Sequence, residues 1–319
     1  MNELLRILLS ERPLFITGDG YRLLVMTVLP YMRLAGTAKM PDVSAFFGWD
    51  PPTYKEETDK AFAKLKNILS EDSLTKAISV TNEYDNLELP QDTIAYHRVW
   101  GFVTAESRWY FSSKQLEQDL TAAEQNPQIS AHLLHVNSSG GEAWYLDRLS
   151  ETMRSLTKPV YTVYENVMAS AAYYIGCHGQ KIYAVTRNDI AGSIGTMISF
   201  HDYEGWYKQM GIKLVEAKAT RSDLKNKITE DLIDGKPQQF IEEILDPVND
   251  QFISEVCSQR PKIASTDKDH PVLRGHIYYS GRAEELGLID GQHTLMEALV
   301  ELSALVRGRR EMNLILDNI

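Results

Sequence analysis

One serine stands among small apolar residues at a position that suggests chemistry. Ser170 lies in the stretch YENVMASAAYYIG, residues 164–176, where an apolar strand-like run gives way to a short run that could begin a helix. A serine hydroxyl attacks a carbonyl carbon only when a base takes its proton. Ser170 is therefore either a small packing residue or a nucleophile, and the rest of the chain must decide between the two.

Two glycine-containing segments could supply backbone donors beside such a nucleophile. The segment NSSGG, residues 137–141, is predicted as a turn between a strand and a helix, and NDIAGSIGT, residues 188–196, has similar features. Glycine permits a positive φ and a close approach of the backbone, and an N–H there could stabilise the oxyanion of a tetrahedral intermediate. Each segment is also compatible with a tight connection, and neither contains the pattern of a phosphate-binding loop.

The chain offers two kinds of base. His201, in ISFHDYEG, could support a Ser-His arrangement, while the lysines of EAKATRSDLKNK, residues 216–227, could support a Ser-Lys dyad. In a dyad, burial lowers the pKa of the lysine until the amine can accept a proton. Taken singly, such lysines are typical of a solvated surface and His201 of a structural histidine. Spacing alone does not choose between these bases.

Composition limits the partners and the compartment. The 319 residues include 44 Asp and Glu against 33 Lys and Arg, with no long basic stripe, so nucleic acid is not expected as a partner. Cys177 and Cys257 lie far apart without metal-ligand spacing, so we expect no metal or cofactor and a reducing compartment. The apolar stretches near the N-terminus are shorter than the roughly 20 residues of a membrane span. The sequence therefore predicts a soluble, cytoplasmic protein.

Alternating strand and helix patterns predict the elements that would position these residues. Strands are expected at 94–104, 131–137, 158–167, 181–185 and 213–219, and helices at 112–127, 142–156, 238–256 and 280–286, the first with a capping box from Ser112 and Gln115. This alternation predicts an α/β fold with a mainly parallel sheet and flanking helices. The acidic segment 83–92 suggests a boundary. We expect a mostly helical N-terminal region of unknown role at 1–88, a main domain at 89–305 and a C-terminal tail at 306–319.

Four segments occur in an order that resembles a known family. HLLHVNSSGG, VMASAAYYIGCHGQKIYA, DIAGSIGTM and SGRAEELGLID are together similar to the signal peptide peptidase A / protease IV family, particularly its phage and prophage branch of head-maturation proteases. The resemblance covers roughly residues 94–302. It implies a ClpP/crotonase-like α/β fold and a serine endopeptidase that uses a Ser-Lys dyad.

The resemblance also assigns roles to residues. Ser170 matches the nucleophile, and Gly140 and Gly141 match the glycines of an oxyanion-hole turn in which Ser139 replaces the family's proline. Ser139 and Ala171, the residue after Ser170, are expected to join these glycines in the oxyanion hole or substrate-binding site. The lysine region departs more from the family pattern, and Lys225 is its best match. Lys218 and Lys227 remain lesser candidates, and Cys177 is expected to be a small buried residue.

The expected function is cleavage of unfolded polypeptides or of phage scaffold or capsid proteins. The resemblance further implies a homo-oligomeric ring in which Ser170 of one chain meets Lys225 of a neighbour. Two alternatives stay open. A crotonase-type acyl-CoA enzyme would share the fold, although no matching glutamate is visible, and a catalytically inactive scaffold-binding protein would explain the altered lysine region.

Overall fold

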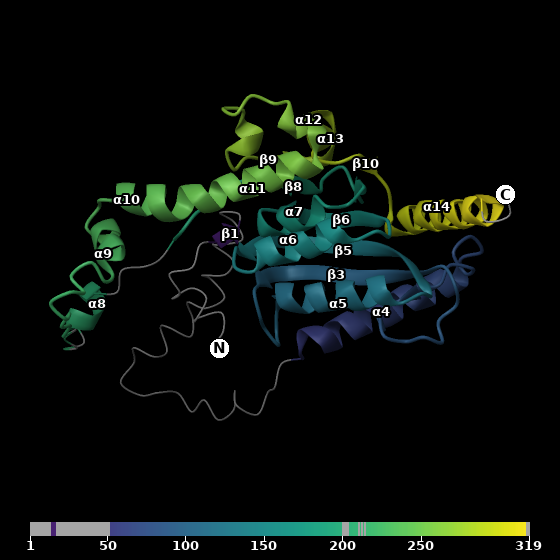
Figure 1. Cartoon of the computed structure of the whole chain (residues 1–319), viewed down its shortest axis with the longest axis horizontal. Helices are drawn as coiled ribbons and strands as arrows, with labels where there is room; N and C mark the ends of the chain where they lie inside the picture. Colours follow the sequence, from purple (N-terminus) through teal and green to yellow (C-terminus); the bar gives the residue numbers. More distant parts are fainter. Residues whose placement is uncertain are drawn as a thin grey trace.

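The centre of the molecule is a mainly parallel β-sheet. The computed structural model describes residues 14–16, 52–199, 204–209, 211, 213 and 215–316. The main path of the sheet runs β10-β7-β6-β5-β3-β2, and every pair along it is parallel (Figure 1). Helices cover both faces of the sheet, which confirms the predicted α/β class and is the architecture expected of a ClpP/crotonase-like domain.

The strands are β1 Leu14–Ile16, β2 Val80–Thr81, β3 Thr93–Thr104, β4 Phe111–Ser112, β5 Ile129–Glu142, β6 Val160–Ala169, β7 Lys181–Ala184, β8 Ile190–Gly192, β9 Ile277–Tyr279 and β10 Gly291–Gln292. The α-helices are α4 Tyr54–Glu71, α5 Ser113–Gln125, α6 Leu146–Ser155, α7 Ala171–Gly176, α8 Glu204–Gln209, α9 Lys227–Ile233, α10 Gln238–Phe240, α11 Asp246–Gln259, α12 Pro261–Ala264, α13 Ser280–Leu286 and α14 Leu295–Leu316. A π-helical segment, Ile241–Leu245, joins α10 to α11, and Pro271–Leu273 forms a 3-10 turn.

Two apolar cores lie on opposite faces of the sheet. Successive residues of β5 alternate between them: Leu134 and Val136 join the core made with α5, α6, α7 and α11, whereas Leu133 joins the core made with α4 and α14. This alternation follows from the two-residue repeat of a strand. Because both faces are covered, the central strands are rich in buried apolar residues, which made them recognisable in the sequence.

The outer parts of the chain share the second core. Phe62 and Leu65 of α4, together with Leu299 and Leu302 of α14, pack against the same face of the sheet. Helix α14 continues from Leu295 to Leu316 across the expected start of the C-terminal tail at residue 306. The division into three regions therefore stays a prediction. None of the described helices combines the length and the apolar character that a membrane span requires.

Three local predictions differ from the structure. The expected turn at 138–141 is a continuation of β5, because Gly140 and Gly141 stay paired with β3. The described residues of 213–219 form no strand, and Val215 is 79% exposed rather than buried in the sheet. The helix expected over 238–256 contains the π-helical segment just before Pro247, which has no N–H to donate.

The cap predicted for the first helix is half present. Ser112 Oγ accepts a hydrogen bond from the Gln115 N–H at 3.2 Å, as expected of an N-cap. The Gln115 side chain instead donates to Asp119, one turn further along α5. The helix accordingly begins at Ser113 and ends at Gln125, within two residues of its predicted bounds.

Because β3 approaches β5 closely, we predict that a side chain at Gly141 lowers the stability of the protein. A Cβ at Gly141 would collide with the carbonyl oxygen of Val103 and lie 2.7 Å from its nitrogen. We expect Gly141→Ala to destabilise the protein by about 1–3 kcal/mol, because a strand of the core must move. Gly308→Ala, in an exposed part of α14 with no atom near its Cβ, is the matched control and should be neutral or stabilising. Urea unfolding of both variants measures the difference, and equal stabilities would contradict the argument.

Candidate active site

Ser170 occupies a sharp turn between β6 and α7. Its φ of 56° and ψ of −122° are unusual for a residue with a side chain. The backbone is held on both sides: the Ser170 N–H donates to the Gly192 carbonyl at 2.9 Å, and its own carbonyl accepts the Tyr174 N–H at 2.8 Å. Such a conformation costs on the order of 1–3 kcal/mol and persists only where the surroundings enforce it.

The side chain of Ser170 is fully buried and its hydroxyl is unused. Its Oγ has no hydrogen-bond partner among the described residues. Ser113 and Ser280 are also buried with unpaired hydroxyls, but neither has a positive φ. Within the described chain, Ser170 alone combines an unpaired buried hydroxyl with a positive φ. Two unfavourable features at one residue are the pattern of a functional position rather than of a packing residue.

The glycines of the candidate oxyanion hole lie level with Ser170. Strands β5 and β6 pair Ser138 with Met168, so Gly140 and Ser170 each lie two residues further along neighbouring strands. Gly140 has a φ of 102°, and its N–H donates to Ser138 Oγ at 3.1 Å. Ser138 Oγ in turn donates to the Gly101 carbonyl, which holds the end of β5 against β3.

The remaining predicted residues belong to the same place. Ser139 is half-buried between Ser138 and Gly140, and Gly141 is buried. Ala171 is fully buried at the first position of α7, where backbone N–H groups have no partner within the helix. The structure thus places Ser170, Ala171 and the residues 139–141 at one end of the sheet, and their catalytic roles stay a prediction.

A buried aspartate that the sequence reading did not single out shapes the neighbouring loop. Asp189 accepts hydrogen bonds from the N–H groups of Asn166, at 3.0 Å, and of Thr186. Asn166 has a φ of 63°, which bends β6 before Ser170. Gly192 also has a positive φ, and a Cβ there would lie 2.6 Å from the His276 carbonyl oxygen. The glycines of DIAGSIGTM were the visible signal for this loop, and Asp189 is the first residue of that segment.

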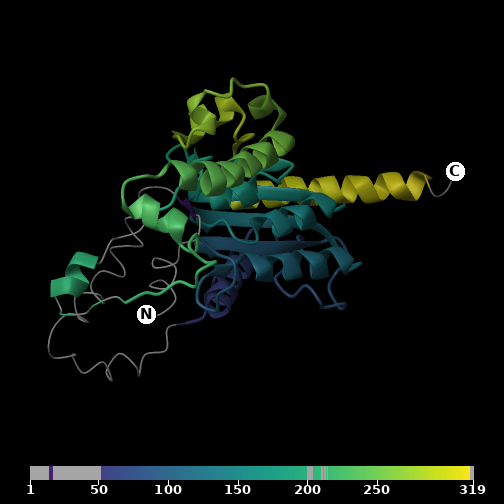
Figure 2. The same ribbon diagram turned by 60° about the vertical axis from the view of Figure 1, so that its left-hand side comes forward.

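The predicted lysines do not reach Ser170. Lys225 is exposed, and the part of the chain that the structure describes shows no side-chain hydrogen bond or ion pair for it. Lys218 forms an ion pair with Glu230, and Lys227 forms one with Asp231 at 2.5 Å. Figures 1 and 2 show α8 and α9 set apart from the sheet, on either side of this lysine segment. Among the described residues, no lysine therefore forms a hydrogen bond with Ser170 Oγ. His201 lies outside the described residues.

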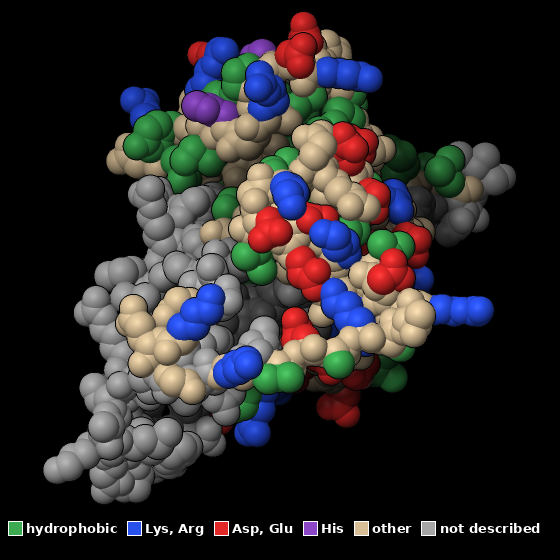
Figure 3. Space-filling view, turned by 90° about the vertical axis from the view of Figure 1, so that its left-hand side faces the viewer, with side chains coloured by type: hydrophobic (Ala, Val, Ile, Leu, Met, Phe, Trp, Pro, Cys, Tyr) green, Lys and Arg blue, Asp and Glu red, His purple; other side chains and the backbone are tan. Residues whose placement is uncertain are grey.

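The face of the molecule on this side carries charges of both signs. Figure 3 shows Lys and Arg side chains interspersed with Asp and Glu rather than gathered into one patch. Lys236 forms ion pairs with Asp231 and Asp234, just beyond the lysine segment 216–227. Since the opposite charges lie close together, this surface does not present a field of a single sign.

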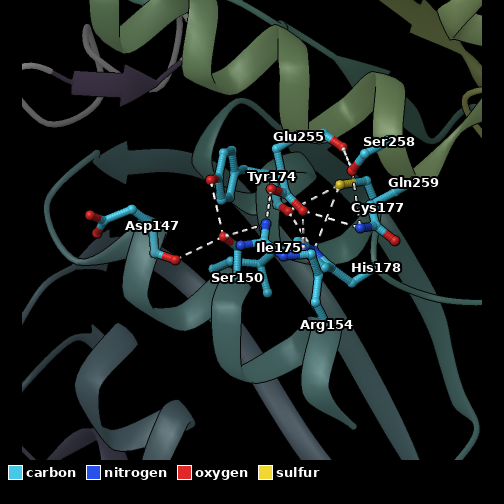
Figure 4. A network of polar contacts seen from close by, with 10 residues as sticks. All are labelled: Asp147, Ser150, Arg154, Tyr174, Ile175, Cys177, His178, Glu255, Ser258 and Gln259. Atoms are coloured by element: carbon cyan, nitrogen blue, oxygen red, sulfur yellow. Dashed lines mark hydrogen bonds and ion pairs between the residues drawn. The ribbon is translucent and has the colours of Figure 1, made fainter. Parts of the chain in front are cut away.

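A polar network anchors the helix that follows Ser170 (Figure 4). Glu255 of α11 accepts hydrogen bonds from His178 at 2.9 Å and from Gln259, and it forms an ion pair with Arg154 of α6. Tyr174 of α7 donates to Ser150 of α6. The network holds α6, α7 and α11 together and so fixes the position of the helix that follows the turn at Ser170.

The cysteine in this network is not a second nucleophile. Cys177 is buried, its thiol donates to the Tyr174 carbonyl at 3.1 Å, and burial raises the pKa of the thiol far above its usual value. A thiol that stays protonated is a poor nucleophile. This agrees with the expectation that Cys177 is a small buried residue. The described residues contain no group of His, Cys, Asp and Glu side chains arranged to hold a metal ion.

A mainly parallel α/β domain that holds a strained, buried serine level with glycine backbone is an architecture suited to a serine peptidase. Residues 152–308 match the family model described as Peptidase family S49, and this match supports a serine protease. The chain is 28% identical over 193 residues to an Enterococcus faecium protein that bears the name signal peptide peptidase SppA, and the match covers 58% of this chain and 53% of the relative. It is 26% identical over 195 residues to protease 4 of Haemophilus influenzae, covering 60% of this chain and 31% of the relative. The chain thus spans about half the length, or less, of these curated relatives.

Two solved structures are also similar. A lysine-to-alanine mutant of the membrane-bound stomatin-specific protease 1510-N, in complex with a substrate peptide, aligns with 66% of this chain and 80% of its own at a TM-score of 0.41 and 14% identity. A mutant of ClpP1 from Listeria monocytogenes aligns with 64% of this chain and 94% of its own at a TM-score of 0.40 and 12% identity.

The anchoring network predicts a specific loss of stability. Glu255→Ala leaves Arg154 and His178 without their acceptor, so we expect a destabilisation of about 3–5 kcal/mol by urea unfolding. The control is Glu151→Ala, whose carboxylate pairs with Arg148 on the exposed side of α6 and should give no measurable change. Similar effects of the two substitutions would show that the network does not anchor the helices.

The same carboxylate predicts how stability depends on pH. Burial alone would raise the pKa of Glu255, but hydrogen bonds and charge from His178, with hydrogen bonds from Arg154 and Gln259, outweigh it and lower the pKa to about 2. A lowered pKa means that the contribution is complete above the ordinary value of 4.5 and is lost as the pH falls toward 2. The stability difference between the native protein and Glu255→Ala should therefore shrink over this range.

Proposed function

We propose that the protein is a serine endopeptidase whose nucleophile is Ser170. The observation that carries the proposal is the buried, unpaired Oγ of a residue with a positive φ at the end of β6, level with Gly140. A residue that served only packing would gain by becoming alanine, since the hydroxyl is desolvated without a partner. The match of residues 152–308 to Peptidase family S49 supports the same reaction class.

The chemistry follows from the groups at this end of the sheet. Ser170 Oγ attacks the carbonyl carbon of a peptide bond while a base removes its proton, giving a tetrahedral intermediate. The proposed donors to the negative oxygen are the backbone N–H groups of Gly141 and Ala171, joined by that of Gly140 if it exchanges its bond to Ser138 Oγ for the substrate. The base returns the proton to the leaving amine, and water then releases the acyl group from Ser170 by the reverse sequence.

The proposed base is Lys225 of a neighbouring protomer in a closed ring. Lys225 lies in an exposed segment that also presents Leu224, 77% exposed, and Ile233, 51% exposed. Contact with a second copy would remove this apolar surface from water. It would also desolvate the amine, which favours the neutral form that accepts a proton. This arrangement accounts for a serine hydroxyl that has no lysine partner among the described residues.

An enclosed ring would admit unfolded or extended chains and exclude folded proteins. The proposed substrates are therefore unfolded polypeptides, and the resemblance to head-maturation proteases extends the proposal to phage scaffold or capsid proteins. A polypeptide substrate agrees with a site built from backbone donors, because such donors recognise the main chain of a peptide rather than one side chain.

Ser170→Ala tests the nucleophile. We expect cleavage of unfolded casein and labelling by a fluorophosphonate probe to fall by several orders of magnitude, with stability unchanged or higher because an unpaired hydroxyl is removed. Ser280→Ala is the matched control, since its hydroxyl is equally buried and unpaired but begins α13 with ordinary backbone. Undiminished cleavage by Ser170→Ala would exclude Ser170 as the nucleophile.

Lys225→Ala tests the base and its origin. We expect a loss of activity nearly as large as for Ser170→Ala, because a dyad acts as a unit, while Lys218→Ala and Lys227→Ala keep most activity. Mixing inactive Ser170→Ala and Lys225→Ala subunits should restore part of the activity, since some interfaces would then join an intact serine to an intact lysine.

Two outcomes would contradict this arrangement. If mixed oligomers stay inactive although mass measurements prove subunit exchange, the base does not come from a neighbour. If His201→Ala is inactive while Lys225→Ala retains activity, a Ser-His mechanism replaces the dyad.

A further inference from the structure

The end of β5 has one edge that the rest of the sheet leaves open. On one side, β3 stays paired with it as far as Gly141. On the other side, β6 pairs with it only as far as Ser138, opposite Met168, and then turns at Ser170 into α7. Backbone groups of β5 beyond Ser138 therefore face the serine turn without a partner from the parallel sheet.

Strand β1 occupies this open edge. It runs antiparallel to β5, with Leu14 opposite Glu142, Phe15 opposite Gly141 and Ile16 opposite Gly140. Figure 1 shows β1 as the purple strand at the left-hand end of the sheet, close to α7. A segment from near the start of the chain thus lies in extended conformation against the candidate oxyanion-hole glycines.

The register brings β1 to the level of the nucleophile. Ser170 and Gly140 each lie two residues beyond the pair formed by Met168 and Ser138, and Ile16 is opposite Gly140. β1 also contacts α7, the helix that begins directly after Ser170. An extended backbone therefore passes through the space that a polypeptide must enter to meet both Ser170 and the glycines.

We propose that Leu14–Ile16 is an intramolecular inhibitor that occupies the substrate-strand position of the active site. This inference rests on the proposed peptidase function. Strand addition uses main-chain hydrogen bonds, so a segment of the chain itself and an extended substrate compete for the same donors and acceptors. Covalent attachment gives the resident strand a high effective concentration, and three residues form a contact short enough to be displaced.

The test removes the backbone donors of β1. In an antiparallel pair, alternate residues direct their N–H groups to the partner strand, so substituting both Phe15 and Ile16 by proline removes the donor in either register. The double alanine variant is the matched control, because it shortens the same side chains but keeps both donors. Both variants are made in the full-length chain.

Two measurements decide the outcome. With unfolded casein as substrate, the proline variant should show a KM lower by about tenfold at unchanged kcat, which corresponds to a native site that is free about one-tenth of the time. The alanine variant should stay close to the native KM. An equal KM in all three proteins, with normal kcat, overturns the inhibitor and leaves the peptidase assignment intact.

The second measurement needs no activity. In the Ser170→Ala background, hydrogen exchange at residues 140–142 should become faster with the two prolines, while exchange in the middle of β6 stays slow and shows that the fold is preserved. Unchanged exchange at 140–142 overturns the occupancy by β1. If the native protein cleaves off its own residues up to Ile16 and Ser170→Ala does not, the inhibitor is also overturned, because the segment is then a substrate.

Discussion

The strained, positive-φ backbone at Ser170 is the constraint on which the rest of the candidate site depends. A residue with a side chain adopts this conformation only when its neighbours leave no alternative. Here the Gly192 carbonyl fixes the Ser170 N–H from one side, and α7 begins immediately on the other. Gly192 reaches that place because Asp189 ties its loop to β6, and α7 is held by Glu255 through His178. Elements far apart in the sequence thus enforce one unfavourable turn.

Much of this arrangement was predictable because its signals are local. The central strands are buried on both faces, so β3, β5, β6 and β7 appear in the sequence as short apolar runs. The end of β5 was not predictable in this way. Its residues, Ser138 to Gly141, have the composition of a turn, yet β3 keeps them extended through pairing that involves residues almost 40 positions away. Composition reports what a segment prefers by itself, whereas pairing is a property of the assembled sheet.

The candidate site likewise has one part that the sequence indicates and one part that it does not. Ser170 and the glycines could be singled out as candidates because glycine adopts backbone conformations that other residues avoid, and positions that require it leave a pattern in the sequence. The lysine leaves no such pattern, because a catalytic lysine and a solvated surface lysine look the same in a sequence. In the structure, Lys218 and Lys227 form ion pairs with Glu230 and Asp231, whereas Lys225 forms none within the described chain, and the choice among the three stays a prediction.

The open edge of β5 connects the architecture of the sheet to the proposed inhibition of the site by β1. A sheet that ends beside a nucleophile must leave backbone groups unpaired if it is to receive an extended chain, and such an edge also attracts unintended partners. Pairing it permanently would abolish binding, while leaving it bare would invite aggregation. A resident strand of three residues satisfies both demands, because it covers Gly140 to Glu142 with few hydrogen bonds and yields to a longer segment that forms more. The shortness of β1 is therefore the property that allows it to protect the edge without closing the site.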